Sequence, residues 1–313
     1  MLAYVVRRIL ATIPVMGVVA VFVFSLLYLS PGDPAAIIAG DQATTEVVEQ
    51  IRQQLGLNEP FLSQFGRWIW RILHGDLGYS IFANQPVSQM ILQRVEPTVA
   101  LAICSMLVSV LFAVPLGVVA AWKAGTWIDR AVMAFAVLGF SFPSFVIGYL
   151  LIFGLAMWAN ILPVQGYVSI SKGVLAFLPN IVMPSLTLGI VLIALIARMT
   201  RASMLEVLSQ DYIRTAQSKG LTNTKVLVGH ALKNASVPIV TTIGLAFALL
   251  ISGVVVTETV FAIPGIGRLT VDAILRRDYP VIQGLVLVFS ASYVLINLLV
   301  DISYTFLDPR IRY

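Results

Sequence analysis

Six long apolar segments, none of which contains an acidic or basic side chain, set the strongest constraint on the fold of this chain. A helix needs about 20 apolar residues to cross the hydrocarbon core of a bilayer. The chain is only 11% charged, against about 25% in a typical soluble domain, so it has too little polar surface to coat a water-soluble globule. We therefore expect an all-α polytopic membrane protein with six transmembrane helices, at residues 9–29, 98–121, 131–158, 181–197, 237–256 and 282–300.

Two of these segments have distinctive sequences. The first follows Arg7 and Arg8, as a secretory signal would, but its apolar run exceeds the roughly 7–15 residues of a signal and no small-x-small cleavage site follows. We expect a retained helix that ends in a turn at residues 30–34. The third segment contains Ser141-Phe142-Pro143-Ser144 in its middle, which predicts a break or tilt there.

The cations predict the orientation. With six spans, twelve Lys and Arg residues fall on the side of the termini and eight on the other, and four of those eight lie in the long segment 30–96. Long segments count little in the positive-inside rule. We therefore expect both the N and C termini in the cytoplasm.

The outer side carries two features. In segment 30–96 the apolar spacing predicts helices at residues 46–55, followed by Gly56, and at residues 60–73, followed by a turn at 75–78. They form either a small cap on the helix ends or a contact for an extracytoplasmic partner. The later loop 258–269 has an apolar stretch broken by Pro-Gly and a second Gly, so it is either a re-entrant gate or a plain turn with a surface helix.

The cytoplasmic segment 198–234 is the most informative polar part of the chain. Residues 202–219 predict one amphipathic helix, with Met204, Leu205, Leu208, Tyr212 and Ala216 on its apolar face. Gly220 is expected to end it, because glycine adopts the left-handed cap conformation without strain. A second short helix, at about 223–233, leads into the fifth span. Such an element either lies on anionic lipid or docks a cytoplasmic partner.

Several kinds of chemistry have no motif here. The sequence has no P-loop, zinc-protease or nucleophile-elbow motif. It contains only two histidines and one cysteine, Cys104. The six predicted spans contain no ionisable group of the kind that proton relays and voltage sensors use. We expect no enzyme, no metal site and no nucleic-acid partner. These absences favour a pathway-forming subunit whose energy is supplied by other chains. A stand-alone carrier or channel for a small polar solute stays as the alternative.

A set of short motifs resembles one family. The run Asp211-Tyr212-Ile213-Arg214-Thr215-Ala216-Gln217-Ser218-Lys219-Gly220 is similar to the coupling-loop motif of ABC importer permeases, matching its second alanine and its glycine. Arg214 and Thr215 depart from the general motif and look like the peptide-importer branch. Further matches occur at 4–8, 31–34, 75–80, 184–189, 230–235, 261–269, 277–280 and 308–310. Together they resemble the dipeptide/oligopeptide/nickel permease family, closest to glutathione- and dipeptide-type members.

The resemblance implies a fold and a set of partners. It implies a type I ABC importer permease in the bacterial inner membrane, with a second homologous permease subunit, two ATPase subunits and an extracytoplasmic substrate-binding protein. ATP and Mg would bind the ATPase subunits, and membrane lipid surrounds the helices. The implied domains are residues 1–29, the outer segment 30–96, a core at 97–305 that contains the coupling element 198–234, and a tail at 306–313.

The same resemblance assigns candidate residues. The coupling contacts would be Asp211, Tyr212, Arg214, Thr215, Ala216, Lys219 and Gly220. A gate or a contact for the binding protein would use Glu258, Phe261, Pro264, Gly265, Gly267 and Arg268. Polar or aromatic residues within the spans, which would line the pathway, are Ser141, Phe142, Ser144, Tyr293 and Asn297. The cargo of such systems ranges over peptides, glutathione, nickel chelates, sugars and opines, and this sequence does not select among them.

Overall fold

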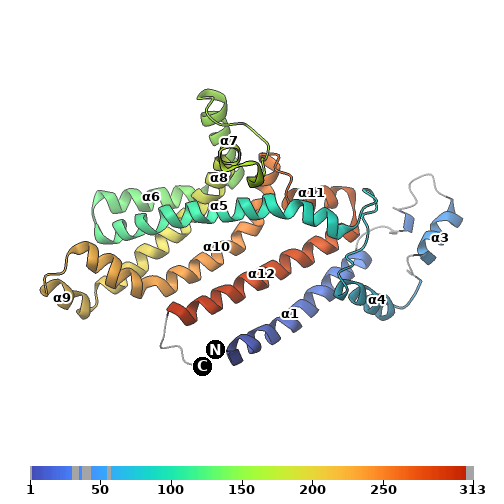
Figure 1. The fold of residues 1–313 in the computed structure, drawn as a ribbon, viewed down its shortest axis with the longest axis horizontal. Coiled ribbons are helices and arrows are strands. Elements are labelled where there is room, and N and C mark those ends of the chain that lie inside the picture. Colours follow the sequence, from blue (N-terminus) through green and yellow to red (C-terminus); the bar gives the residue numbers. More distant parts are fainter. Residues whose placement is uncertain (1, 30–34, 37–43, 55–57, 308–313) are drawn as a thin grey trace. The chain divides into compact units, whose positions relative to one another are not determined.

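The computed structural model describes residues 2–29, 35–36, 44–54 and 58–307. The regular elements of the described residues are helices, with one isolated bridge between Tyr79 and Pro86 (Figure 1). In chain order the helices are α1 (Leu2–Leu29), α3 (Thr45–Gln54), α4 (Phe61–Leu73), α5 (Val87–Trp122), α6 (Trp127–Ser141), α7 (Ser144–Leu151), the π-helix η1 (Ile152–Trp158), the 3-10 helix η2 (Ile170–Lys172), α8 (Val174–Leu208), α9 (Asp211–Ser218), the π-helix η3 (Lys225–Leu232), α10 (Lys233–Val260), α11 (Ile266–Arg276) and α12 (Tyr279–Leu307).

The predicted spans are present. Five helices of the described chain are long and apolar enough to cross a bilayer, and α6 with α7–η1, bent by 104°, forms the sixth if the pair is one broken span. The break lies where the sequence predicts it. Phe142 is extended (φ −89°, ψ 133°) and Pro143 precedes α7. Proline disfavours the α conformation of the residue before it, so Pro143 ends α6.

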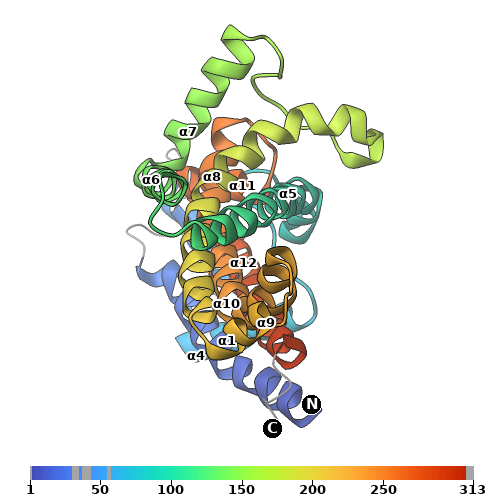
Figure 2. The same cartoon turned by 90° about the vertical axis from the view of Figure 1, so that its left-hand side faces the viewer.

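The described chain divides into two compact units. Among the described residues, the first unit comprises Val95–Arg268 together with residues 295–307. Its central helix is α8, which packs against α6, α7 and α10 (Figure 2). Two thirds of the most apolar part of α8 is buried, against about one third for α10. The core that results draws on α5, η1, α8 and α10 and includes Leu101, Ile181, Met183, Ile196, Leu250, Val254 and Phe261.

Small residues bring α5 and α8 close together. A Cβ added to Gly117 of α5 would lie 2.5 Å from the Cβ of Thr200 and 2.7 Å from the carbonyl oxygen of Ala197. The hydroxyl of Ser109 donates to the carbonyl oxygen of Gly189 at 3.3 Å. Close approach at small residues is the usual way for helices to associate in a membrane, where the hydrophobic effect between them is weak. The two glycines therefore fix the spacing of these helices.

The second unit comprises Leu2–Arg94 with Leu269–Val294. The ring of Phe24 on α1 lies 5.2–5.5 Å from the rings of Phe61, Phe65 and Trp68 on α4, centroid to centroid. Aromatic pairs at such distances and tilts are stabilising. The aromatic cluster thus fixes α4 on α1, while Trp70 on the same helix is 65% exposed. Whether the outer segment is a cap or a contact for an extracytoplasmic partner stays open.

A polar contact and a close approach complete the second unit. The hydroxyl of Ser80 donates to the buried carboxylate of Asp278 at 2.5 Å, which ties the turn after α4 to the start of α12. A Cβ on Gly284 would lie 2.7 Å from a methyl group of Val87. The predicted turn at 30–34, the helix stop at Gly56 and the motif at 308–310 lie outside the described residues.

Candidate functional site

The element between α8 and α10 is the first candidate site, and its helix differs from the prediction. The prediction of one helix over residues 202–219 is wrong, because α8 ends at Leu208 and Gln210 is extended (φ −75°, ψ 147°) before α9 begins. The hydroxyl of Ser209 donates to the carbonyl oxygen of Glu206 at 2.7 Å. Serine side chains compete in this way for backbone groups and favour helix ends. Ser209 therefore marks the break.

The predicted helix end at Gly220 is confirmed. Gly220 has φ +78°, and its N–H donates to the carbonyl oxygen of Gln217 at 2.9 Å. The N–H of Leu221 donates to the carbonyl oxygen of Ala216 at 3.3 Å. This pair of hydrogen bonds is the Schellman motif, which requires a left-handed residue at the position of Gly220. No atom lies within 4 Å of a Cβ added there, so the backbone angle is what demands glycine.

An apolar cluster fixes the inner face of α9. Ile213 and Ala216 are buried there, at 1% and 8% exposure. They pack in one cluster with residues of α5, α8, η3 and α10, namely Ala121, Met204, Val226, Leu227, Ala231, Ala235 and Ile239. The sequence predicted Tyr212 on the buried apolar face. The break at Ser209 rotates α9 relative to α8, so Ile213 lies on that face instead and Tyr212 is 41% exposed.

The outer face of α9 is polar and exposed. Asp211, Arg214, Thr215 and Lys219 all lie on it. The amide nitrogen of Asn234 donates to the hydroxyl oxygen of Tyr212 at 2.8 Å and to the carbonyl oxygen of His230 at 3.0 Å, which joins α9 to the start of α10. Figure 1 shows α9 beyond the ends of α8 and α10. The element is therefore a short helix with an apolar inner side, a polar outer side and fixed ends.

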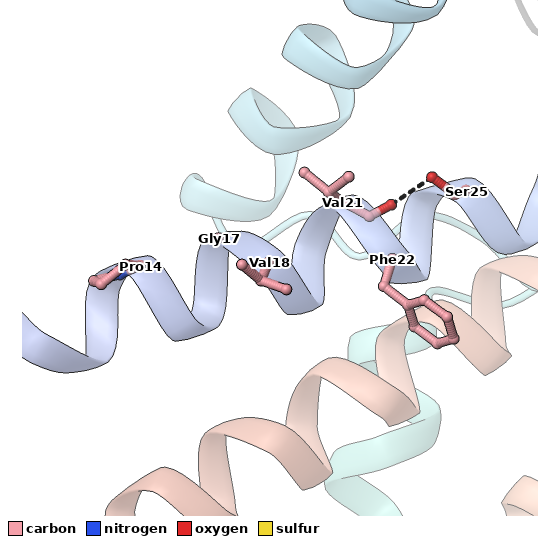
Figure 3. Close-up of a pocket in the computed structure, with 6 residues that line it drawn as sticks. All are labelled: Pro14, Gly17, Val18, Val21, Phe22 and Ser25. Atoms are coloured by element: carbon pink, nitrogen blue, oxygen red, sulfur yellow. Dashed lines mark hydrogen bonds between the residues drawn. The ribbon is translucent and has the colours of Figure 1, made fainter.

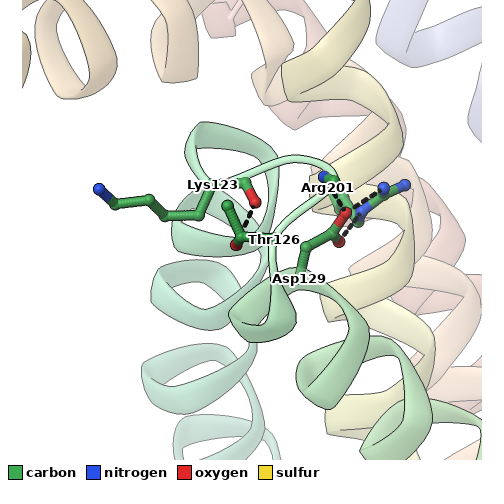
Figure 4. Close-up of polar contacts among 5 residues, drawn as sticks. Lys123, Thr126, Asp129 and Arg201 are labelled. Atoms are coloured by element: carbon green, nitrogen blue, oxygen red, sulfur yellow. Dashed lines mark hydrogen bonds and ion pairs between the residues drawn. The ribbon is translucent and has the colours of Figure 1, made fainter.

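A charged pair joins α6 to α8 near the same end of the helices (Figure 4). The buried carboxylate of Asp129 accepts hydrogen bonds from Nε of Arg201 at 2.5 Å, from its Nη2 at 2.7 Å and from the N–H of Gly125 at 3.0 Å. Two parallel bonds to one guanidinium group are a strong and directional arrangement. Sequence reasoning missed this pair, because the third span was expected to start after Asp129. Thr126-x-x-Asp129, which has capping-box spacing, is the signal that marks a helix start there.

The second candidate site is the turn between α10 and α11. Glu258 was expected in a loop, but it lies in the last turn of α10, fully buried. Its Oε1 accepts from the hydroxyl of Thr98 at 2.6 Å and its Oε2 accepts from the N–H of Arg268 at 2.9 Å, while the hydroxyl oxygen of Thr98 accepts from the N–H of Ile266 at 2.8 Å. The first turn of α11 thus finds partners for N–H groups that a helix start leaves free.

The two glycines of this turn make room for that carboxylate. A Cβ on Gly265 would collide with the carboxylate of Glu258, and a Cβ on Gly267 would lie 2.7 Å from Cα of Val255. Phe261, Gly265 and Gly267 are buried, whereas Pro264 is exposed. Of these candidates for a gate or partner contact, Pro264 and the half-exposed Arg268 reach the surface. The role of the turn stays a prediction.

The loop before α8 is joined to the same turn. The N–H of Gly166 donates to the carbonyl oxygen of Phe261 at 2.9 Å, and the hydroxyl of Tyr167 donates to the carboxylate of Glu96 at 3.1 Å. Burial, together with this carboxylate, raises the pKa of Tyr167. The turn after α10 therefore has hydrogen-bonded neighbours from two other parts of the first unit, α5 and the loop before α8.

The five candidate pathway residues come from two separate parts of the chain. Ser141, Phe142 and Ser144 lie at the break between α6 and α7, while Tyr293 and Asn297 lie one turn apart on α12. A hollow of about 170 Å³ lies beside Ser141, lined by Met133, Ala136, Val137, Phe140, Ala194, Leu195 and Arg198. A pathway role for these five residues stays a prediction.

A second hollow lies along α1 (Figure 3). Its lining comes from that helix alone, from Pro14, Gly17, Val18, Val21, Phe22 and Ser25. The hydroxyl of Ser25 donates to the carbonyl oxygen of Val21 at 2.7 Å, as Figure 3 shows. With one apolar helix as its wall and its hydroxyl engaged, this surface offers no built site for a polar ligand.

Comparison with known proteins agrees with this architecture. The family model described as "Binding-protein-dependent transport system inner membrane component" matches residues 113–313, and its N-terminal counterpart matches residues 1–102. A probable peptide ABC transporter permease of Sinorhizobium fredii, y4tP, is 54% identical over 310 residues, with 99% of each chain covered. The glutathione transport system permease protein GsiC of Escherichia coli O6:H1 is 45% identical over the whole length of both chains.

A solved structure shares the fold. A chain of the MetNI methionine ABC transporter, in inward-facing conformations, matches with a TM-score of 0.59 at 17% identity, covering 70% of this chain and 97% of that one. The type I permease fold expected from the sequence is thereby confirmed, and so is the family resemblance. The chain belongs to the family of binding-protein-dependent transport system inner membrane components, as a multi-pass protein of the bacterial inner membrane.

Proposed function

We propose that this chain is the permease subunit of an ATP-driven importer and forms half of the transmembrane pathway for peptides or a similar small solute. Family membership supports the permease role, and the relatives named for peptide and glutathione transport support the class of cargo. A second homologous permease supplies the other half of the pathway. An extracytoplasmic binding protein delivers the solute, and both termini of this chain lie in the cytoplasm.

The element at α9 carries the coupling part of the proposal. Its inner face is locked into an apolar cluster by Ile213 and Ala216, while the side chains of Asp211, Arg214 and Lys219 are exposed on the other side. A helix held in this way is suited to fit a groove on a partner. Two ATPase subunits, which bind ATP and Mg, are the proposed partners.

The packing gives a route for motion. Because α9 shares one cluster with α5, α8 and α10, a push on its outer face displaces these helices as a body. Interfaces between packed helices switch between discrete arrangements rather than deforming continuously. ATP-bound and ATP-free partners that bind α9 differently would then shift the transporter between its two orientations.

The test uses the outer face of α9 in the assembled transporter. The double variant Arg214→Glu with Lys219→Glu reverses two exposed charges and leaves the buried cluster intact. We expect the chain to reach the membrane at an unchanged level, to lose co-purifying ATPase subunits and to lose ATP-dependent peptide uptake. Arg276→Glu, an exposed cation on α11, is the matched control. Unchanged ATPase co-purification and uptake in the double variant would overturn the coupling assignment.

Packing must be tested separately from docking. Ala216 belongs to the buried cluster, so Ala216→Glu forces a charge into an apolar site and unfolds the element rather than probing its outer surface. Ala216→Ser, which is nearly the same size, should retain docking. If Ala216→Ser abolished ATPase binding while leaving the melting temperature unchanged, Ala216 itself would have to touch the partner.

A further inference from the structure

The turn between α5 and α6 gathers aromatic and basic side chains that the proposed function does not use. Trp122 is 47% exposed and Trp127 is 76% exposed. Nζ of Lys123 lies 4.4 Å from the centroid of the Trp122 ring, a cation–π contact. Arg130, one turn into α6, is also exposed. Two exposed indoles, the half-buried side chain of Lys123 and the exposed side chain of Arg130 therefore lie within nine residues.

The charge of this turn is not neutralised from inside. Asp129 is the one acidic residue between positions 122 and 130, and its carboxylate is buried and occupied by Arg201 and by the N–H of Gly125. Figure 4 shows the side chain of Lys123 pointing away from that pair. The turn therefore presents net positive charge, from Lys123 and Arg130, next to exposed indole rings.

The backbone of the turn is fixed. Gly125 has φ +79°, and the N–H and the hydroxyl of Thr126 both donate to the carbonyl oxygen of Lys123, at 3.0 and 2.6 Å. The turn also joins two membrane-spanning segments, so it lies at the level of a bilayer surface. Tryptophan, lysine and arginine are favoured at that level, and cations there attract anionic headgroups.

We propose that this turn binds the headgroup of an anionic phospholipid. Lys123 and Arg130 contact the phosphate, and the rings of Trp122 and Trp127 lie between the headgroups and the acyl chains. A lipid suits the site better than a protein, because both flanking helices enter the hydrocarbon and because tryptophan prefers the boundary between apolar and wet surroundings. The role is independent of α9 and of the solute.

The test measures local lipid composition in the assembled transporter. Ala124→Cys, an exposed position in the turn, carries a bimane label in a cysteine-free background. The nanodiscs contain equal fractions of phosphatidylglycerol and phosphatidylcholine, with a nitroxide on one or the other. We expect nitroxide phosphatidylglycerol to be enriched near the label by about fivefold for each cation it meets, since one cation near an anionic surface contributes about 1 kcal/mol. Lys123→Gln with Arg130→Gln should bring the two lipids to near parity.

Matched controls separate the outcomes. A bimane at Ser171→Cys, with Lys172→Gln as its charge variant, reports on an exposed cation outside this turn. Equal quenching by both lipids at position 124, or a preference that survives Lys123→Gln with Arg130→Gln, would overturn the proposal. So would loss of ATPase co-purification in that double variant with the lipid preference unchanged, since the surface would then belong to a protein. Uptake in pure phosphatidylcholine tests the proposed function separately.

Discussion

Breaking the pair between Asp129 and Arg201 should destabilise the first unit strongly. The side chain of Asp129 is 6% exposed. Arg201→Met leaves its carboxylate with the N–H of Gly125 as the one remaining hydrogen-bond donor among the residues that the structure describes. Removal of one partner of a buried pair costs about 3–5 kcal/mol. Because the side chain of Arg201 is 27% exposed, water screens part of the interaction, and we expect the low end, about 3 kcal/mol.

Replacing the acidic partner should lower the free energy of unfolding by less. Asp129→Leu leaves a guanidinium group that can turn toward water, so we expect a loss of about 1.5 kcal/mol, comparable with one hydrogen bond to a charged group. In the double variant Asp129→Leu with Arg201→Met the charges are gone and apolar groups of similar size meet, which is often nearly neutral. We expect the double variant to lose about 1 kcal/mol, so the singles exceed it by about 3.5 kcal/mol.

The assay is reversible unfolding of the purified chain in mixed micelles, titrated with dodecyl sulfate and followed by circular dichroism. The exposed pair of Arg67 and Glu59, each 43% exposed, gives the matched cycle, Arg67→Met with Glu59→Leu. Surface pairs contribute about 0–1 kcal/mol. If the coupling between Asp129 and Arg201 were no larger than that of the surface pair, the argument from burial and bidentate geometry would be refuted.

Three further predictions follow from single contacts. Gly220→Ala should cost about 1–2 kcal/mol, the strain of a left-handed alanine, and should lower uptake without removing the chain from the membrane; unaltered unfolding would contradict the Schellman assignment. Gly265→Ala should destabilise the turn by about 1–3 kcal/mol, because the new methyl group meets the Glu258 carboxylate, and Glu258→Gln in the same chain should not restore it. The raised pKa of Tyr167 predicts a contribution to stability that is present below about pH 10 and is lost as the pH rises through the higher pKa of the folded state. In Tyr167→Phe the unfolding midpoint should therefore vary less with pH across that range.

The spans could be predicted from the sequence because composition determines them. An apolar run free of charges has few stable places other than a bilayer. The break between α6 and α7 is likewise indicated by Pro143. Gly220 was also predictable, since its role is local: the backbone angle after α9 requires glycine whatever surrounds it. The helix ends were less certain, because the helices continue past their apolar cores, as α8 does to Leu208.

The contacts that fix the candidate sites could not be predicted in the same way. Thr98 and Glu258 are 160 residues apart, and Asp129 and Arg201 are 72 apart, so no local pattern pairs them. The apolar face of α9 was misassigned for a local reason. A helical wheel assumes one continuous helix, and a break at Ser209 rotates every later position relative to the earlier ones.

The helix that begins after Gly220 links the two candidate sites. From residue 223 it runs through η3 into α10 without a break, and it ends in the turn where Glu258 holds the start of α11. Its first part is packed against α9 by Val226, Leu227 and Ala231. A continuous helix transmits displacement along its axis because shortening it would break backbone hydrogen bonds. We therefore expect a displacement of α9 to reach the Glu258 turn, unless the π-helical segment η3 absorbs it by a shift of register.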